Sequence, residues 1–223
     1  MLAARLLLCL AFVIAMLNHV SSAAGAAPAT ELHAAAASGD TARVRALLAS
    51  GAAIDARDTQ GRTALLVATH HNQVQAAKAL IEAGADVNAK DAIQDSPYLY
   101  AGARGHNEIL RMALAHGADL RSTNRYGGTA LIPAAERGHV ETVRMLIAAG
   151  VDVDHVNRLK WTALLEAIIL GNGGAAHTEI VRLLVQARAN VNLADGEGVS
   201  PLQHARQRGY AQIERILSAA GAR

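Results

Sequence analysis

The chain has 223 residues and carries 21 basic and 19 acidic side chains, which leaves a formal net charge of +2. So small an imbalance gives no electrostatic reason to expect a nucleic acid or an anionic membrane as partner. Hydrophobic residue types make up 52% of the chain, but aromatic types only 3%. The apolar content is mostly Ala, Leu, Val and Ile, which suits thin helices packed closely together.

The first segment has the three regions of a secretory signal peptide. Arg5 is the only charged residue before Glu31, and it precedes an unbroken apolar run from Leu6 to Leu17 and then small residues. This order predicts a signal peptide over residues 1–24, with cleavage after residue 23, 24 or 26, and a short linker over residues 25–29. The run of about 12 residues is shorter than the roughly 20 that span a bilayer. Retention as an uncleaved anchor is the alternative.

Cys9 is the only cysteine, and it lies inside the apolar run. A lipid anchor at Cys9 is not expected, because Leu8 is not a small residue and no completed apolar segment precedes it. The mature chain would then contain no cysteine and could form no disulfide.

The rest of the chain repeats itself. A Thr or Ser followed two residues later by Leu or Tyr recurs as an anchor, in the segments TELHAA, TALLVA, SPYLYA, TALIPA, TALLEA and SPLQHA. The anchors are Thr30, Thr63, Ser96, Thr129, Thr162 and Ser200. The first four steps are 33 residues long and the last is 38. This pattern resembles the ankyrin repeat, whose signature is T-P-L-H-x-A at a period of 33 residues.

The resemblance implies an all-α solenoid of about six helix-turn-helix units over residues 30–223, with short β-hairpin or loop tips. Thr63, Thr129 and Thr162 stand where each first helix needs an N-cap. The leucines two positions later, and apolar residues such as Val143, Leu146, Ile147, Ile180, Leu183 and Leu184 in the second helices, should form one shared core. Gly51, Gly84, Gly117 and Gly150 should take the left-handed conformation that ends a helix.

Three departures from the pattern stand out. Arg188 occupies the helix-ending glycine position of the fifth unit, where a left-handed conformation costs about 1 kcal/mol. Pro133 lies about four residues into its helix, at the edge of where proline is tolerated. Five extra residues, 172–176, separate the helices of the fifth unit and are expected to form a flexible surface loop. Phosphate binding by this glycine-rich stretch is not expected, since no strand precedes it and no Lys-Ser/Thr follows.

The resemblance further implies a concave face built from the first helices and the tips. Residues four, seven and eight past each anchor share one stripe of the helix and are expected to be exposed. They are Val67, His70, His71, Tyr100, Ala103, Arg104, Pro133, Glu136, Arg137, Glu166, Ile169, Leu170, His204, Gln207 and Arg208.

The middle units carry an apolar and aromatic centre with arginines around it, which is the composition of a protein-binding hot spot. The candidate partner-binding residues are Ile93, Tyr100, Arg104, Arg125, Tyr126, Arg137, Arg158, Leu159, Trp161, Glu166, Ile169 and Leu170. Packing between tips is the alternative role for Trp161, and the 172–176 insertion could cover Ile169 and Leu170. No cofactor is implied. Adjacent His70 and His71 diverge by about 100° on a helix, so no metal site is expected there.

The sequence contains no recognisable catalytic motif, which indicates a binding protein rather than an enzyme. The composition and the signal resemble bacterial exported ankyrin proteins, which implies a periplasmic location and a protein partner, with secretion as an alternative. Two roles remain open: a companion or stabiliser of an envelope enzyme, and an immunity or inhibitor protein that neutralises a toxin. An unrecognised hydrolase and an effector delivered to a host cell are the rivals from other classes. The chain is expected to be monomeric on its own.

Overall fold

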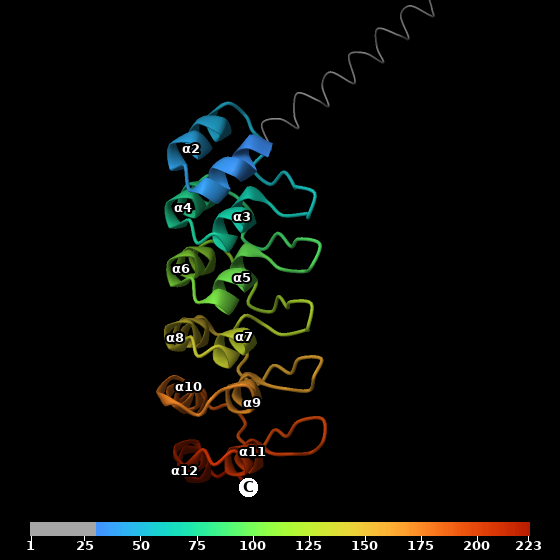
Figure 1. Cartoon of the computed structure of the whole chain (residues 1–223), viewed down its shortest axis with the longest axis vertical. Helices are drawn as coiled ribbons and strands as arrows, with labels where there is room; N and C mark the ends of the chain where they lie inside the picture. The colour runs from blue at the N-terminus through green and yellow to red at the C-terminus, as the bar shows by residue number, and fades with distance from the viewer. Residues whose placement is uncertain (1–29) are drawn as a thin grey trace, which may run out of the picture.

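A computed structural model describes residues 30–223, which form a stack of helix pairs (Figure 1). A helix over residues 30–38 comes first. The helices that follow are α2 (Thr41–Ala49), α3 (Ala64–His70), α4 (Val74–Glu82), α5 (Pro97–Arg104), α6 (Asn107–Ala115), α7 (Leu131–Glu136), α8 (Val140–Ala149), α9 (Ala163–Ile169), α10 (Ala175–Gln186), α11 (Pro201–Gln207) and α12 (Ala211–Ala219). The predicted signal peptide (1–24) and linker (25–29) lie outside the described residues.

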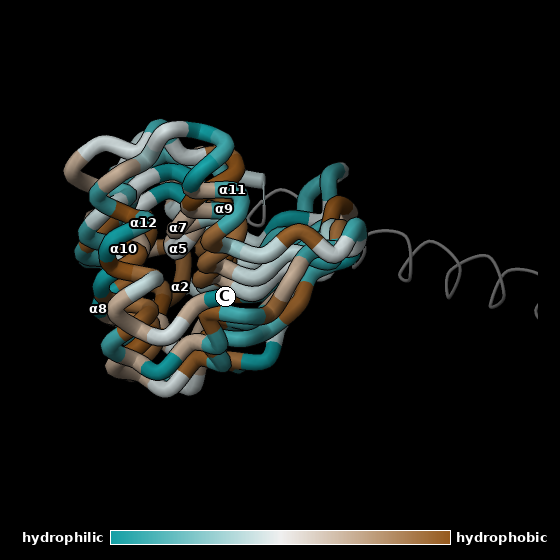
Figure 2. Tube along the Cα trace, turned by 90° about the horizontal axis from the view of Figure 1, so that it is seen from below, coloured by the Kyte–Doolittle hydropathy of each residue, from teal (hydrophilic) through white to brown (hydrophobic). Residues whose placement is uncertain are grey.

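The helices form two parallel columns, and the loops between units project to one side (Figure 1). Odd-numbered helices form the column beside the loops, and even-numbered helices from α2 to α12 form the outer column. Viewed along the stack, hydrophobic stretches lie mainly between the two columns (Figure 2). The predicted solenoid is therefore confirmed.

The first helices begin at hydroxyl caps. Thr63 Oγ1 accepts from the Leu66 amide at 3.2 Å, and Thr162 Oγ1 accepts from the Leu165 amide at 3.2 Å, as the repeat pattern predicts. Each bond satisfies an amide that has no partner within the helix.

The prediction of an N-cap at Thr129 was wrong. Its hydroxyl is buried without a hydrogen-bond partner, and α7 begins one residue later than the pattern predicts, after Ala130. Pro133 explains the difference, because it has no amide hydrogen to donate to the Thr129 carbonyl. In the second unit the Val67 amide makes the equivalent bond to Thr63 O at 3.0 Å. Thr129 O accepts instead from Ile132 at 3.3 Å, so the first turn of α7 is distorted.

The helix-ending glycines are confirmed. Gly51, Gly84, Gly117 and Gly150 have φ values between +81° and +94°. Arg188 takes the same left-handed conformation, with a φ of +66°. The fifth unit therefore keeps the backbone path of its neighbours, although this conformation strains a residue that has a Cβ.

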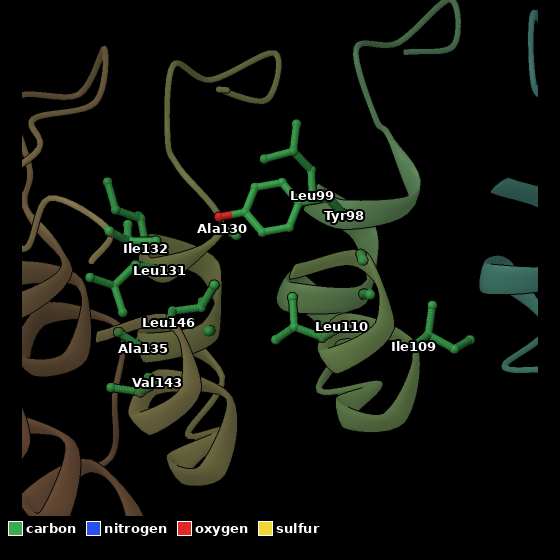
Figure 3. Packing of buried hydrophobic residues seen from close by; sticks show 14 of the residues in the cluster. Tyr98, Leu99, Ile109, Leu110, Ala130, Leu131, Ile132, Ala135, Val143 and Leu146 are labelled. Carbon is green, nitrogen blue, oxygen red and sulfur yellow. The ribbon is translucent and has the colours of Figure 1, made fainter. Parts of the chain in front are cut away.

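One apolar core runs through the stack. Leu65, Leu131 and Leu164 are buried, as are Val143 and Leu146. Figure 3 shows side chains of α5 and α6 facing those of α7 and α8. Among the predicted core residues Ile147 is only partly buried, and it packs against the edge of the core. Because each unit buries its apolar face only against its neighbours, stability is shared along the stack.

The tips are hydrogen-bonded turns, and no strand occurs within residues 30–223. Each turn is closed by an Asp or Asn five residues before the anchor. Asn157 Oδ1 accepts from the amides of Leu159 at 2.9 Å and Trp161 at 3.0 Å. Asp91 and Asn124 make the equivalent bonds in their tips.

The 172–176 insertion lies at the surface as expected, but its last two residues begin α10 and contacts hold it in place, which corrects the expectation of a flexible loop. Tyr210 donates its hydroxyl to Gly171 O at 2.9 Å, and the ring of Tyr210 lies where a Cβ on Gly173 would be, 2.4 Å away. The buried His177 bonds Asn172 Oδ1 at 3.0 Å and Glu136 O at 2.9 Å. The residues that flank the insertion, Gly171 and His177, thus connect the fourth, fifth and sixth units.

Candidate partner-binding groove

Three tip residues form an exposed apolar row. Ile93, Tyr126 and Leu159 occupy the same position in successive units and expose 51%, 56% and 56% of their surface. The Arg158 amide donates to Tyr126 O at 3.0 Å, which holds two of these tips side by side. Leu170, at the end of α9, exposes 51% and was also predicted to be accessible. Exposed apolar clusters of this kind usually mark interaction sites.

A groove of about 390 Å³ lies between these tips and helices α5, α7 and α9. Its lining includes eight of the twelve candidate residues: Tyr100, Arg104, Arg125, Tyr126, Arg137, Leu159, Glu166 and Leu170. Four candidates lie outside the lining: Ile93, Arg158, Trp161 and Ile169. Trp161 and Ile169 are half-buried, so the structure leaves a packing role open for both.

Arginines that line the groove, and Arg158 beside it, reach back toward the preceding unit. Arg125 lies 3.7 Å from Asp95 Oδ2, with its guanidinium 4.8 Å from the centre of the Tyr126 ring. Arg137 donates to Ala103 O at 2.8 Å. In the same direction, Arg158 donates to Arg125 O at 2.7 Å. These contacts hold the arginines along the rim and fix their direction.

The predicted exposed stripe is wrong at its first position in three of the five units that it covers. Val67, Pro133 and Glu166, four residues past their anchors, are buried. Tyr100 and His204, at the same position, are half-buried. Neighbouring first helices pack closely because their facing residues are small. Gly102 shows how close: a Cβ there would lie 2.8 Å from Ala130 Cβ. The accessible stripe is therefore carried by the residues at the helix ends.

Glu166 is the unusual member of this position, because only 5% of its surface is exposed. Asn157 Nδ2 donates to its Oε1 at 2.9 Å. Burial raises the pKa of the Glu166 carboxyl to about 7, and the negative charge of Glu136 adds to the rise. The bond from Asn157 and the charge of Arg137 act in the opposite direction on this pKa.

Asn157 was not identified from the sequence as part of the site. The recurrence of Asp or Asn five residues before each anchor is a detectable signal, but it indicates only a turn. What the pattern does not reveal is that Asn157 uses its remaining amide group on Glu166, nine residues away.

His70 and His106 connect the second and third units. The His70 and Tyr100 rings are 4.1 Å apart, and burial lowers the pKa of His70. His106 Nδ1 bonds the carbonyl of Thr69 at 3.0 Å and so ties two units together. Residues 30–223 contain no group of three or more His, Cys, Asp or Glu side chains able to hold a metal ion. In that same part of the chain, no helix combines the length and apolar character needed to cross a membrane.

Comparison with known sequences agrees with this geometry. The family model for ankyrin repeats (3 copies) matches residues 1–91 and 98–195. The chain belongs to the ankyrin-repeat family. Ankyrin repeats are protein–protein interaction modules. A curated relative, the ankyrin repeat protein YahD of Escherichia coli (strain K12), is 46% identical over 57 residues. That match covers 26% of this chain and 28% of YahD, so it spans well under half of either protein.

Solved ankyrin structures resemble the stack over most of its length. An ankyrin repeat domain from Acinetobacter baumannii AYE is 67% identical with a TM-score of 0.85, covering 86% of this chain and 98% of that one. The ankyrin repeat protein EF0377 is 44% identical with a TM-score of 0.81, covering 84% and 96% of the two chains. The ankyrin repeat domain of Bcl-3, a member of the IkappaB protein family, is 29% identical with a TM-score of 0.77, covering 86% of each chain.

Proposed function

We propose that this ankyrin-repeat protein works in the bacterial envelope, where it binds a partner protein through the groove and acts as a companion that stabilises an envelope enzyme. The row of Ile93, Tyr126 and Leu159 is the observation that carries the proposal. Side chains at the ends of tips have no folding reason to be large and apolar, and these three are more than half exposed. Their burial by a partner would contribute favourable free energy that folding leaves unused.

The composition of the groove supports a macromolecular partner. Aromatic and arginine side chains are enriched where protein interfaces gain most of their free energy. Here Tyr126 lies at the centre, and Arg125 is stacked on its ring. Arg158 is held by a backbone carbonyl, so less side-chain entropy is lost when a partner binds.

The envelope location is supported by the N-terminal sequence. The apolar run after Arg5 has the form of a signal peptide. Beyond that run, residues 24–223 contain no cysteine, so an oxidising compartment presents no risk of unwanted disulfides.

The test is site-specific photocrosslinking in the producing cell. A photoreactive residue in place of Leu159 should crosslink one dominant partner, whereas the same residue in place of Arg144 on α8 should not. Activity of the isolated partner with and without the ankyrin protein then decides its role. Slower inactivation of a partner enzyme supports the companion role. Inhibition of a toxic partner would instead indicate the immunity role. Equal crosslinking at positions 159 and 144 would contradict the groove assignment.

A further inference from the structure

The carboxyl group of Glu166 forms no ion pair within residues 30–223, although the charge of Arg137 lowers its pKa. One of its oxygens accepts from the neutral amide of Asn157, and within residues 30–223 no ion pair involves either Glu166 or the nearby Glu136. Both residues line the groove. A buried carboxylate is costly unless a cation compensates it, so the charge of Glu166 is only partly compensated in the isolated protein.

The groove's own arginines do not complete this compensation. Arg137 follows Glu136 in sequence, but its guanidinium donates to Ala103 O at 2.8 Å, one unit before. Arg125 reaches in the same direction, toward Asp95. The positive groups are therefore held on the third-unit side of the groove, and the carboxyl groups of Glu136 and Glu166 belong to its fourth- and fifth-unit side.

A carboxyl at position 166 is not required by the fold. The equivalent residues of the other five units are Ala34, Val67, Tyr100, Pro133 and His204, none of them acidic. An ionisable group in a cleft with a strongly raised pKa is a candidate functional group. Only 5% of the Glu166 surface is exposed, and apolar Leu159 and Leu170 line the same groove. These surroundings strengthen the attraction between Glu166 and a positive charge that binds there.

We propose that the partner places a Lys or Arg side chain in this groove, where it pairs with Glu166 and Glu136 while apolar residues beside it cover Tyr126, Leu159 and Leu170. This inference rests on the proposed function, which it makes more specific. It identifies the recognised element as an extended segment or loop with one basic residue between apolar ones. A volume of about 390 Å³ is near the lower end of the range for ligand pockets, about 300–1,000 Å³, and suits a long side chain rather than a helix.

The test compares how three capped tripeptides bind to the folded protein. The measurement is made at about pH 8, where Glu166 is largely ionised. The peptides are acetyl-Leu-Arg-Leu-amide, its citrulline counterpart, which has the same shape without the charge, and its glutamate counterpart. Binding is followed by NMR shifts of backbone amides at millimolar peptide. The arginine peptide should shift Asn157, Leu159 and Leu170, with an affinity about tenfold above that of the citrulline peptide.

Glu166→Gln is the decisive variant, because glutamine keeps an oxygen for the bond from Asn157. It should remove the preference for arginine over citrulline. The control is Glu141→Gln on the outer helix α8, where the exposed carboxylate pairs only with Arg144, and it should keep the preference. Equal binding of the arginine and citrulline peptides, tighter binding of the glutamate peptide, or no saturable shift with the arginine peptide would each overturn the inference.

The two proposals can fail separately. Successful crosslinking at Leu159 without any preference for the arginine peptide would leave the binding function intact and remove only the cationic anchor. Failure of both experiments would mean that this groove is not the partner surface.

Discussion

Asn157 and Glu166 form a buried side-chain pair in which the amide Nδ2 donates to the carboxyl Oε1 at 2.9 Å. The same two positions in the last unit hold Asp195 and His204, with His204 Nε2 donating to Asp195 Oδ2 at 2.7 Å. The geometry is shared by the two units, but donor and acceptor are exchanged. Three other units place an aspartate at the position of residue 157 and the fourth unit places Asn124. An amide at residue 157 can serve the acid at residue 166 as a donor, which an aspartate could not do.

The first prediction is that Asn157→Asp destabilises the protein at about pH 8. Two carboxyl groups would then face each other without a donor, at an expected cost of about 1–3 kcal/mol in the free energy of unfolding. Adding Glu166→Gln should restore most of the loss, because the glutamine amide can donate to the introduced carboxylate while the turn bonds persist. Denaturant unfolding of the two single variants and the double variant measures the coupling. Simple additivity of the two changes would mean that the pair does not interact.

The second prediction concerns pH and stability. The pKa of the Glu166 carboxyl rises from 4.5 to about 7 in the folded protein, so the folded state binds this proton more tightly than the unfolded state. The resulting stability is fully present below about pH 4.5 and decreases as pH rises toward 7, by up to about 3 kcal/mol. Glu166→Gln lacks this dependence. Its unfolding free energy should match wild type near pH 4 and exceed it near pH 8, and a constant difference at both pH values would contradict the raised pKa.

The third prediction is that Leu159→Ala and Trp161→Ala each weaken partner binding by about 2 kcal/mol, the usual scale of a hot spot. The Leu159 change should leave the melting temperature almost unchanged, because that side chain is 56% exposed. Calorimetry with the partner that crosslinking identifies measures the affinity. Arg144→Ala is the outer-face control. For Trp161, a large drop in melting temperature together with unchanged binding would show that its role is packing.

The fourth prediction is a stability gradient along the stack. Leu146→Ala in the fourth unit should cost about 2–4 kcal/mol, as large-to-small changes in a core do. Leu217→Ala should cost less, although both residues are fully buried, because the terminal helix α12 can fray without opening its neighbours. Denaturant melts of both variants check this, and equal losses would mean that the stack unfolds as one indivisible unit.

The fifth prediction is export with cleavage of the N-terminal segment. The mature chain should begin between Ala24 and Ala27, because cleavage is expected after residue 23, 24 or 26. N-terminal sequencing of the protein from the envelope fraction decides it. An intact Met1 on the abundant species would indicate an uncleaved anchor instead.

The sequence by itself determined the architecture of this protein. A period of 33 residues with caps such as Thr63 and Thr162 and left-handed glycines such as Gly84 specifies each unit through local interactions, and local interactions can be read from a single chain. The same periodicity predicted the exposure of Ile93, Tyr126 and Leu159, since equivalent positions in a stack have equivalent surroundings.

Only the tertiary structure decided what happens between the units. Tyr210 and His177 anchored the insertion, and the close packing of first helices buried Glu166. Each of these outcomes depends on contacts between residues in different turns or units, and on how much space separates them. The partnership of Asn157 with Glu166 belongs to this class, because a spacing of nine residues has no fixed geometry until the tip folds back over α9.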